Sequence, residues 1–217
     1  MQLHYFPFYG RAEPIRMLFH KAGVTDYEDV IHTFEEWPAL KKEGGFEFKA
    51  MPVLFITDPA TGEKKQYCQT HAILRFLGKK YGYYPEDPED AYQVDSDMDA
   101  WNDLLMAMIK IHWAKDEEAK KAAETELATG ALPTVLGALS ARLEKNASRG
   151  RFLVGSGLTI ADFLFGGMLV NLIFNELNTT QSTVRPIFEQ YEQIMKYKEA
   201  FCEEFAEYLV TRPKRER

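Results

Sequence analysis

A nine-residue segment, GYYPEDPED at residues 82–90, divides the chain into two parts with different hydrophobic patterns. Its two prolines and its acidic residues interrupt regular structure, which is typical of a linker. Before it, short apolar runs alternate with helical patterns, whereas after it nearly every apolar pattern has helical spacing. The sequence therefore predicts an α/β region over residues 1–81 and an all-helical region over residues 89–217.

In the first region, strands are expected at residues 3–6 (LHYF), 27–31, 52–56 and 65–67. A helix is expected where Ile15, Leu18, Phe19 and Ala22 share one face, and another over 73–81. The segment between the second and third strands contains Trp37, Pro38, Gly44 and Gly45 and is expected to be a loop. The order β-α-β, loop, β-β-α predicts a small α/β unit with a mixed sheet.

The second region shows one long amphipathic stripe over 94–108 and another over 136–143. An apolar helix is expected over 159–175. Thr159 and Asp162 form a capping pattern at its start, with Leu158 and Phe163 as a hydrophobic staple, so we interpret Asp162 as a folding element. Two shorter helices are expected at about 186–195 and 199–209.

Composition excludes several classes of function. The net charge of −7 argues against general nucleic-acid binding, which depends on Lys and Arg neutralising phosphates. No apolar run is long enough to span a membrane, and the first residues do not have the pattern of a secretory signal. The two cysteines, Cys68 and Cys202, form no CxxC pair, so a disulfide framework is not expected. We therefore expect a cytoplasmic protein.

Six segments match one known family in order and spacing: LHYF with GRAEPIR, EEWPALKK, AMPVL, QTHAILRFLGKKYG, VGSGLTIADF and YLVTRP. With them the chain resembles the cytosolic glutathione transferases. It is most similar to their sigma class, which includes the glutathione-dependent prostaglandin D synthases. The resemblance implies a thioredoxin-like domain at 1–81 and a helical domain at 89–217, usually in a homodimer. It also implies glutathione as co-substrate and no tightly bound cofactor.

Tyr5 ends the first expected strand, and Arg11 follows the next turn. A free thiol has a pKa of ~8.5, so an enzyme that uses glutathione must stabilise the thiolate. A hydrogen-bond donor aimed at the sulfur does so. Taken alone, a strand tyrosine is more often a packing residue, and Arg11 is also compatible with an ordinary surface position. The resemblance assigns the donor role to Tyr5 and added positive potential to Arg11, and we predict both as catalytic.

Proline at the start of a strand, as in Met51-Pro52, can hold a cis peptide bond. The resemblance implies that this bond is cis and that the main chain of Met51 pairs with the cysteinyl part of glutathione. Gln69 and Thr70 begin a predicted helix, whose free N–H groups suit a carboxylate. The resemblance places the γ-glutamyl carboxylate there, although Thr70 is equally suited to be a simple N-cap.

Three further residues complete the predicted glutathione site. Trp37 and Lys41 match residues that hold the glycyl end, although Trp37 could instead anchor its loop. Asp103 matches an aspartate that reaches across the dimer to the glutathione amine. Asp99 and Asn102 match positions that bind a divalent cation in some prostaglandin synthases. Because Asn102 replaces a carboxylate and the five histidines have no ligand spacing, no metal site is predicted.

The second substrate is expected in an apolar pocket, for which the candidates flank the first turn or line the long helix: Phe6, Phe8, Tyr9, Met106 and Trp113. Periodicity does not separate such residues from the core. The leading hypothesis is an enzyme that conjugates glutathione to small hydrophobic electrophiles. The alternatives are a glutathione-dependent isomerase, such as a prostaglandin D synthase, and a non-catalytic structural or ligand-carrying relative.

Overall fold

The first 81 residues contain a four-stranded mixed sheet. The computed structural model describes residues 1–178 and 184–215. β1 (Gln2–Tyr5) pairs in parallel with β2 (Glu28–Ile31) and antiparallel with β3 (Val53–Thr57), which pairs antiparallel with β4 (Lys64–Cys68). The strand order is β2-β1-β3-β4. The predicted mixed sheet is confirmed.

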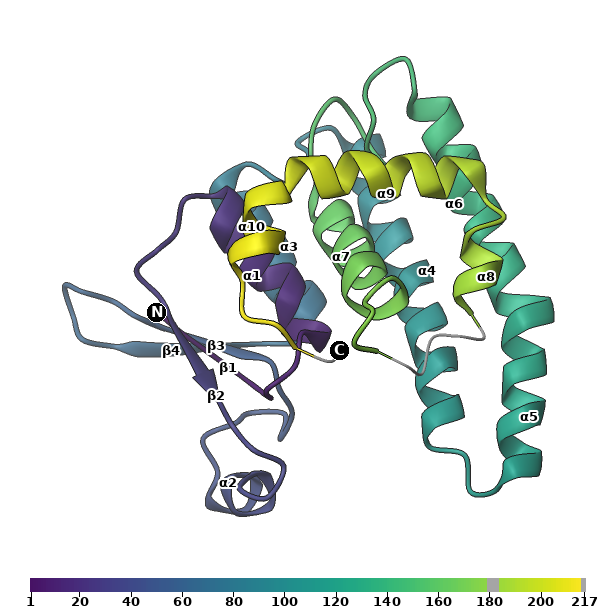
Figure 1. Ribbon diagram of the computed structural model, residues 1–217. Helices are drawn as coiled ribbons and strands as arrows, with labels where there is room; N and C mark the ends of the chain where they lie inside the picture. The colour runs from purple at the N-terminus through teal and green to yellow at the C-terminus, as the bar shows by residue number, and fades with distance from the viewer. Residues whose placement is uncertain (179–183, 216–217) are drawn as a thin grey trace.

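Two helices, α1 (Glu13–Lys21) and α3 (Thr70–Tyr81), lie on the side of the sheet that faces the rest of the molecule (Figure 1). A short 3-10 turn, η1 (Gly10–Ala12), leads from β1 into α1. The segment that the sequence predicted as a loop contains a helix, α2 (Trp37–Glu43), which lies apart from α1 and α3. Its proline stands in the first turn, where the missing N–H costs no hydrogen bond, so Pro38 is not evidence against a helix.

The region after α3 is helical throughout its regular structure (Figure 1). Two π-helical turns, η2 (Leu127–Ala131) and η3 (Leu169–Ile173), follow α5 and α7 directly. The α-helices are, in chain order, α4 (Pro88–His112), α5 (Glu117–Glu126), α6 (Leu132–Asn146), α7 (Ile160–Met168), α8 (Arg185–Phe188), α9 (Glu192–Glu204) and α10 (Ala206–Thr211).

The predicted bounds of the last helices are wrong. The expected helix 186–195 spans a break, since α8 ends at Phe188 and α9 begins at Glu192 after an extended Tyr191. The expected helix 199–209 crosses the join between α9 and α10 at Phe205. Aromatic residues recur through the whole segment, so periodicity alone did not mark these breaks.

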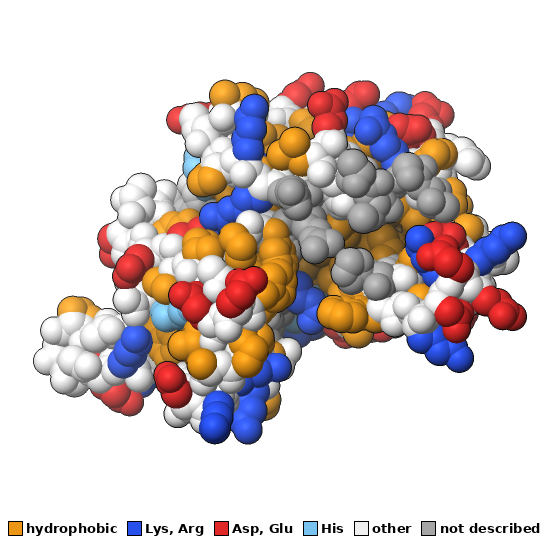
Figure 2. Space-filling model, turned by 60° about the horizontal axis from the view of Figure 1, so that its bottom comes forward, with side chains coloured by type: hydrophobic (Ala, Val, Ile, Leu, Met, Phe, Trp, Pro, Cys, Tyr) orange, Lys and Arg blue, Asp and Glu red, His pale blue; other side chains and the backbone are white. Residues whose placement is uncertain are grey.

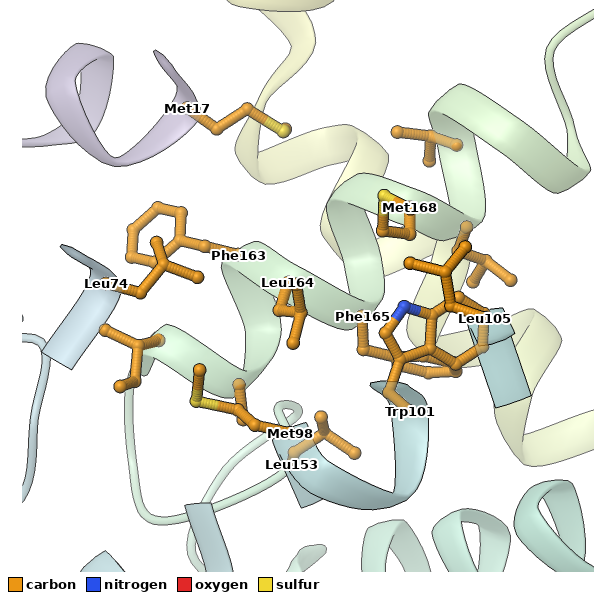
Figure 3. Close-up of a cluster of buried hydrophobic side chains, with 14 of the residues drawn as sticks. Met17, Leu74, Met98, Trp101, Leu105, Leu153, Phe163, Leu164, Phe165 and Met168 are labelled. Carbon is orange, nitrogen blue, oxygen red and sulfur yellow. The ribbon is translucent and has the colours of Figure 1, made fainter. Parts of the chain in front are cut away.

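Helix α7 lies at the centre of the core. Figure 3 shows its side chains among those of three other helices: Phe163, Leu164, Phe165 and Met168 of α7, Trp101 and Leu105 of α4, Leu74 of α3 and Met17 of α1. The rings of Trp101 and Phe165 meet edge to face with centroids 5.0 Å apart. Because both sequence regions pack on α7, burial of this helix holds the α/β region against the helical region.

The start of α7 has the predicted capping box. The Asp162 carboxylate accepts hydrogen bonds from the Thr159 N–H (2.8 Å) and the Leu153 N–H (3.0 Å). The Tyr197 hydroxyl donates to the same carboxylate at 3.2 Å. Burial raises the pKa of Asp162 to about 6 in spite of these donors. Asp162 therefore acts in folding, as predicted.

The segment after α10 returns to the α/β region and contacts it through charged side chains. Arg212 lies 2.9 Å from the carboxylate of Glu13, and Arg215 lies 3.0 Å from that of Asp29. Arg16 pairs with both Glu13 and Asp29, at 3.0 Å each. Glu13 and Arg16 are buried, so these ion pairs join the C-terminal segment to α1 and β2 in a low-dielectric interior.

In the part of the chain that the structure describes, no helix is both long and apolar enough to cross a membrane.

Candidate active site

The hydroxyl of Tyr5 lies at the end of β1 and accepts a hydrogen bond from the Arg11 N–H at 2.9 Å. Tyr5 is only 5% exposed, and its burial raises the pKa of the phenol, so the group stays protonated at neutral pH. Since the oxygen accepts from Arg11, the O–H hydrogen remains available to donate. The Tyr5 hydroxyl is therefore able to donate a hydrogen bond to a further group.

Gly10 makes room for this hydroxyl. Its φ is +41°, and a Cβ at this position would lie 2.6 Å from the Tyr5 Oη and 2.9 Å from the ring of Phe8. A side chain here would displace the tyrosine or the turn. Gly10 is thus required both for the backbone conformation of the turn and for the space that the Tyr5 and Phe8 side chains occupy.

Arg11 connects the turn to two helices. The carbonyl oxygen of Arg11 accepts from the Thr70 hydroxyl at 3.3 Å, at the first residue of α3. The Arg11 guanidinium reaches the Met106 sulfur on α4 at 3.1 Å. Thr70, Arg11 and Tyr5 therefore form one hydrogen-bonded series, although sequence reasoning treated Thr70 only as a cap or ligand-binding residue.

Two backbone features distinguish the neighbouring strands. The Met51-Pro52 peptide bond is cis, as predicted. Gln69, which precedes α3, has φ +69°, an uncommon conformation for a residue other than glycine. Such outliers concentrate at functional sites, where the surrounding structure maintains them. Pro52 directly precedes β3 and Gln69 directly follows β4. Because Val53 pairs with Cys68, both features lie at the same end of this strand pair, where the glutathione site is predicted.

Trp37 and Lys41 lie together on α2, with the Lys41 ammonium 5.3 Å from the centre of the Trp37 ring. The same ring meets Phe46 edge to face at 5.3 Å and is half-buried. These contacts fit the alternative role of Trp37, which is to anchor its segment. Lys41 lies next to it.

Asp99 and Asp103 are exposed on α4. Asp99 lies 3.5 Å from a ring nitrogen of His71 and 3.8 Å from Arg75. Asn102 is half-buried on the same helix. Among the described residues, no group of three His, Cys, Asp or Glu side chains is arranged to hold a metal ion.

A cavity of about 870 Å³ opens beside Tyr5 and Arg11. Figure 2 shows hydrophobic side chains in the walls of the hollow between the two regions. Of the five residues predicted for the pocket, Phe8 and Trp113 line the cavity. Its volume is within the range of ordinary ligand sites. Most of the other lining residues come from α4, α5, η2, the end of α7 and η3, including Leu105, Met108, Ile109, Leu127, Met168, Asn171 and Leu172.

The other three predicted residues are not part of that cavity wall. Tyr9 is buried; its hydroxyl donates to the Pro213 carbonyl at 3.1 Å, and the Arg212 guanidinium lies 4.0 Å from its ring centre. Phe6 packs beneath Phe34, and Met106 is half-exposed beside Arg11. Sequence reasoning missed Phe34, which does line the cavity and which no periodic pattern identifies.

The family model described as the glutathione S-transferase C-terminal domain matches residues 102–212. Glutathione S-transferase 2 of Manduca sexta is 34% identical over 165 residues, which cover 76% of this chain and 75% of that protein. The solved structure of a Fasciola hepatica sigma-class glutathione S-transferase aligns with a TM-score of 0.82 and 27% identity, covering 100% of this chain and 98% of that one. Prostaglandin synthase D of Nilaparvata lugens aligns with a TM-score of 0.81 and 26% identity over 98% of each chain.

The fold of this chain, a mixed sheet followed by a helical region, matches those structures over nearly the whole chain. The chain belongs to the glutathione S-transferase family. The predicted family and fold class are confirmed, and the curated relatives support the predicted class of enzyme, a glutathione transferase.

Proposed function

We propose that this protein joins the thiolate of glutathione to small hydrophobic electrophiles, with Tyr5 as the donor to the sulfur. The hydrogen bond from the Arg11 N–H to the Tyr5 oxygen is the observation that carries this proposal. It fixes the hydroxyl at the cavity wall with its proton free, and burial keeps the phenol protonated. A donor held in place stabilises the thiolate relative to the thiol without reorganising during the reaction.

In the proposed complex, the tripeptide lies along the polar edge of the site. The main chain of Met51, before the cis Pro52, pairs with the cysteinyl unit, and the start of α3 at Gln69 and Thr70 holds the γ-glutamyl carboxylate. Trp37 and Lys41 hold the glycyl end. Arg11 places positive charge beside the sulfur, and its guanidinium contact with Met106 supports that position.

The second substrate occupies the cavity between Tyr5 and α4. Its mostly apolar lining favours a hydrophobic molecule, and Phe8 and Trp113 belong to that lining. In a substitution reaction, the sulfur electron pair forms a C–S bond while the leaving group departs with its own bonding pair. The thiol proton passes to solvent. No bound cofactor is needed for this step.

We also propose a cytoplasmic, sigma-like homodimer that acts in detoxification. Asp103 is exposed on α4 and does not line the cavity of its own subunit, which suits a role toward glutathione in a partner. Cys68 and Cys202 are free, and burial raises the pKa of both thiols, so they suit a reducing compartment. The same thiolate chemistry would serve a prostaglandin isomerase, a second candidate that the Nilaparvata lugens synthase favours.

The test is the rate of glutathione conjugation to a dinitro-substituted chlorobenzene, measured across pH. We expect Tyr5→Phe to lower kcat by ~10²-fold, because one fixed donor to the anion is lost, while glutathione binding is largely kept. The wild-type rate should follow a thiolate pKa below ~8.5. Tyr92→Phe removes a hydroxyl from an exposed tyrosine outside the cavity and is the matched control. Equal rates for Tyr5→Phe and wild type would overturn the mechanism.

A further inference from the structure

Three phenylalanine rings lie nearly parallel beside the cavity, and two of them, Phe8 and Phe34, line it. The planes of Phe6 and Phe34 differ by 17° with centroids 4.6 Å apart, and those of Phe8 and Phe34 differ by 23° at 5.7 Å. Phe6 and Phe8 differ by 15° at 5.6 Å. We call these residues the aromatic platform. Distances and angles of this kind are those of offset-stacked rings.

The platform adjoins the reactive end of the site. The Phe8 ring meets the Tyr5 ring edge to face, with centroids 5.3 Å apart, and Phe6 does the same at 5.6 Å. Phe8, Phe34 and Tyr5 all line the cavity. A flat molecule lying on the platform would therefore have its edge close to the sulfur that faces Tyr5.

Phe34 presents an open ring face. Phe6 covers one face of the ring, yet 55% of Phe34 is exposed. The exposed Phe34 ring is contiguous with the rings of Phe6 and Phe8, and contiguous exposed apolar surface of this kind is typical of ligand-binding grooves. Because Phe34 lines the cavity and is exposed, a ligand there can contact its ring.

The turn that carries Phe34 is held in place by its neighbours. The Thr33 N–H donates to the Glu36 carboxylate at 2.8 Å, and the Glu36 N–H donates to the Thr33 hydroxyl at 3.2 Å. The Trp37 N–H donates to the Thr33 carbonyl at 3.2 Å at the start of α2. This reciprocal pattern is that of a capping box, so the platform is formed before a ligand arrives.

We propose that Phe34 selects the second substrate: the aromatic platform binds planar, electron-poor aromatic electrophiles in preference to open-chain ones. Electron-poor rings stack favourably on the electron-rich faces of phenylalanine. Stacking also holds the ring carbon that carries the leaving group beside the thiolate, which shortens the search for a reactive orientation. This inference rests on the proposed function and names the substrate class of the same site.

The experiment compares two reactions of one thiolate. With a dinitro-substituted chlorobenzene, a C–S bond forms and chloride leaves with the C–Cl electron pair. With a straight-chain 2-alkenal, the sulfur adds to the β-carbon, the neighbouring carbon takes a proton, and nothing leaves. We expect Phe34→Leu, which keeps apolar bulk, to lower kcat/KM for the aryl chloride about fivefold and to change the alkenal value less than twofold. Tyr92→Leu, an exposed aromatic outside the cavity, should change neither.

Equal losses with both substrates, or no loss with the aryl chloride, would overturn the assignment of Phe34. A changed assembly mass with unchanged rates would assign Phe34 to a subunit contact and would also overturn it. Binding of unreactive dinitrobenzene, followed by quenching of tryptophan fluorescence, tests the platform without turnover. The affinity should fall about fivefold in Phe34→Leu, and an unchanged affinity contradicts the inference. Wild-type protein that binds dinitrobenzene but conjugates neither electrophile would refute the proposed function alone.

Discussion

The turn after β1 and the middle of α7 both require a glycine, but for different reasons. At Gly10 the absent side chain leaves room for a hydroxyl, that of Tyr5, and the backbone has positive φ. At Gly166 the backbone is ordinary helix, and the absent side chain leaves room for the ring of Phe201 on α9. One glycine makes room for a side chain of the candidate site, and the other makes room for helix packing. Substitution of Gly166 should therefore lower the stability of the fold, whereas substitution of Gly10 should also lower the activity.

The largest expected effect concerns packing. In Gly166→Ala the new Cβ would overlap the Phe201 ring, and we expect a loss of about 3 kcal/mol in the free energy of unfolding, measured with urea. The control is Gly137→Ala on α6, where no atom lies within 4 Å of the added carbon. That change should stabilise the protein by about 0.5–1 kcal/mol. Similar losses in both variants would mean that helix propensity, and not the contact with Phe201, governs Gly166.

The two regions also differ in how they bury charge. Glu13 and Arg16 in the α/β region have ion-pair partners on both sides. Asp97 on α4 is 3% exposed; one carboxylate oxygen lies 2.8 Å from Arg142, whereas the other has no partner among the described residues. Burial, together with the nearby Asp162 carboxylate, raises the pKa of Asp97 to about 7.

The raised pKa predicts a pH dependence of stability. In the unfolded chain Asp97 titrates near ~3.9, so between about pH 4 and pH 7 the folded protein holds a proton that the unfolded chain has lost. This contribution to stability is therefore lost as pH rises through 7. The unfolding free energy of wild type should fall between pH 5 and pH 8. In Asp97→Asn, which has no titrating group at this position, the fall should be smaller by about 2 kcal/mol. If urea titrations give the same change in unfolding free energy from pH 5 to pH 8 for Asp97→Asn and wild type, Asp97 does not change its protonation on folding in this range and the prediction is wrong.

The smallest effect concerns the site. In Gly10→Ala we expect kcat/KM to fall about tenfold, equivalent to ~1.4 kcal/mol of transition-state stabilisation, because the new Cβ would lie 2.6 Å from the Tyr5 Oη. Gly62→Ala, in the turn between β3 and β4, is the matched control. Its φ is +72°, so it suffers the same kind of backbone strain, but nothing lies within 4 Å of the added carbon. Both variants should lose stability, and only Gly10→Ala should lose activity.

How much the sequence predicted depended on whether the determinant was local. The capping box at Thr159 depends on residues three apart and was predicted from their pattern. The cis bond at Met51-Pro52 was predicted because the resemblance implied it, since a proline at the start of a strand only permits such a bond. The break between α8 and α9 was not predicted, because tertiary contacts of the buried Phe188 and Ile194 decide it. Local patterns therefore fix where elements start more reliably than where long apolar stretches divide.

The candidate site shows the same limit. Tyr5, Arg11 and Thr70 were assigned to the site by the resemblance, since their positions alone also suited packing, surface and capping roles, and the structure links them by hydrogen bonds. Whether they act on glutathione remains a prediction. Phe34 lies in a turn without periodicity, and only folding brings its ring against Phe6 and Phe8. Tyr9 and Phe8 are neighbours in sequence, yet only Phe8 reaches the cavity.

The ion pairs of the C-terminal segment have a consequence for the order of events during synthesis. Glu13 emerges from the ribosome before its partner Arg212, which follows 199 residues later. Until then the buried position of Glu13 lacks one of its counter-charges, and burying an incompletely paired carboxylate is costly. The α/β region therefore reaches its final packing only after Arg212 has been synthesised, so a ribosome-bound chain truncated before Arg212 would hold this region in a looser state.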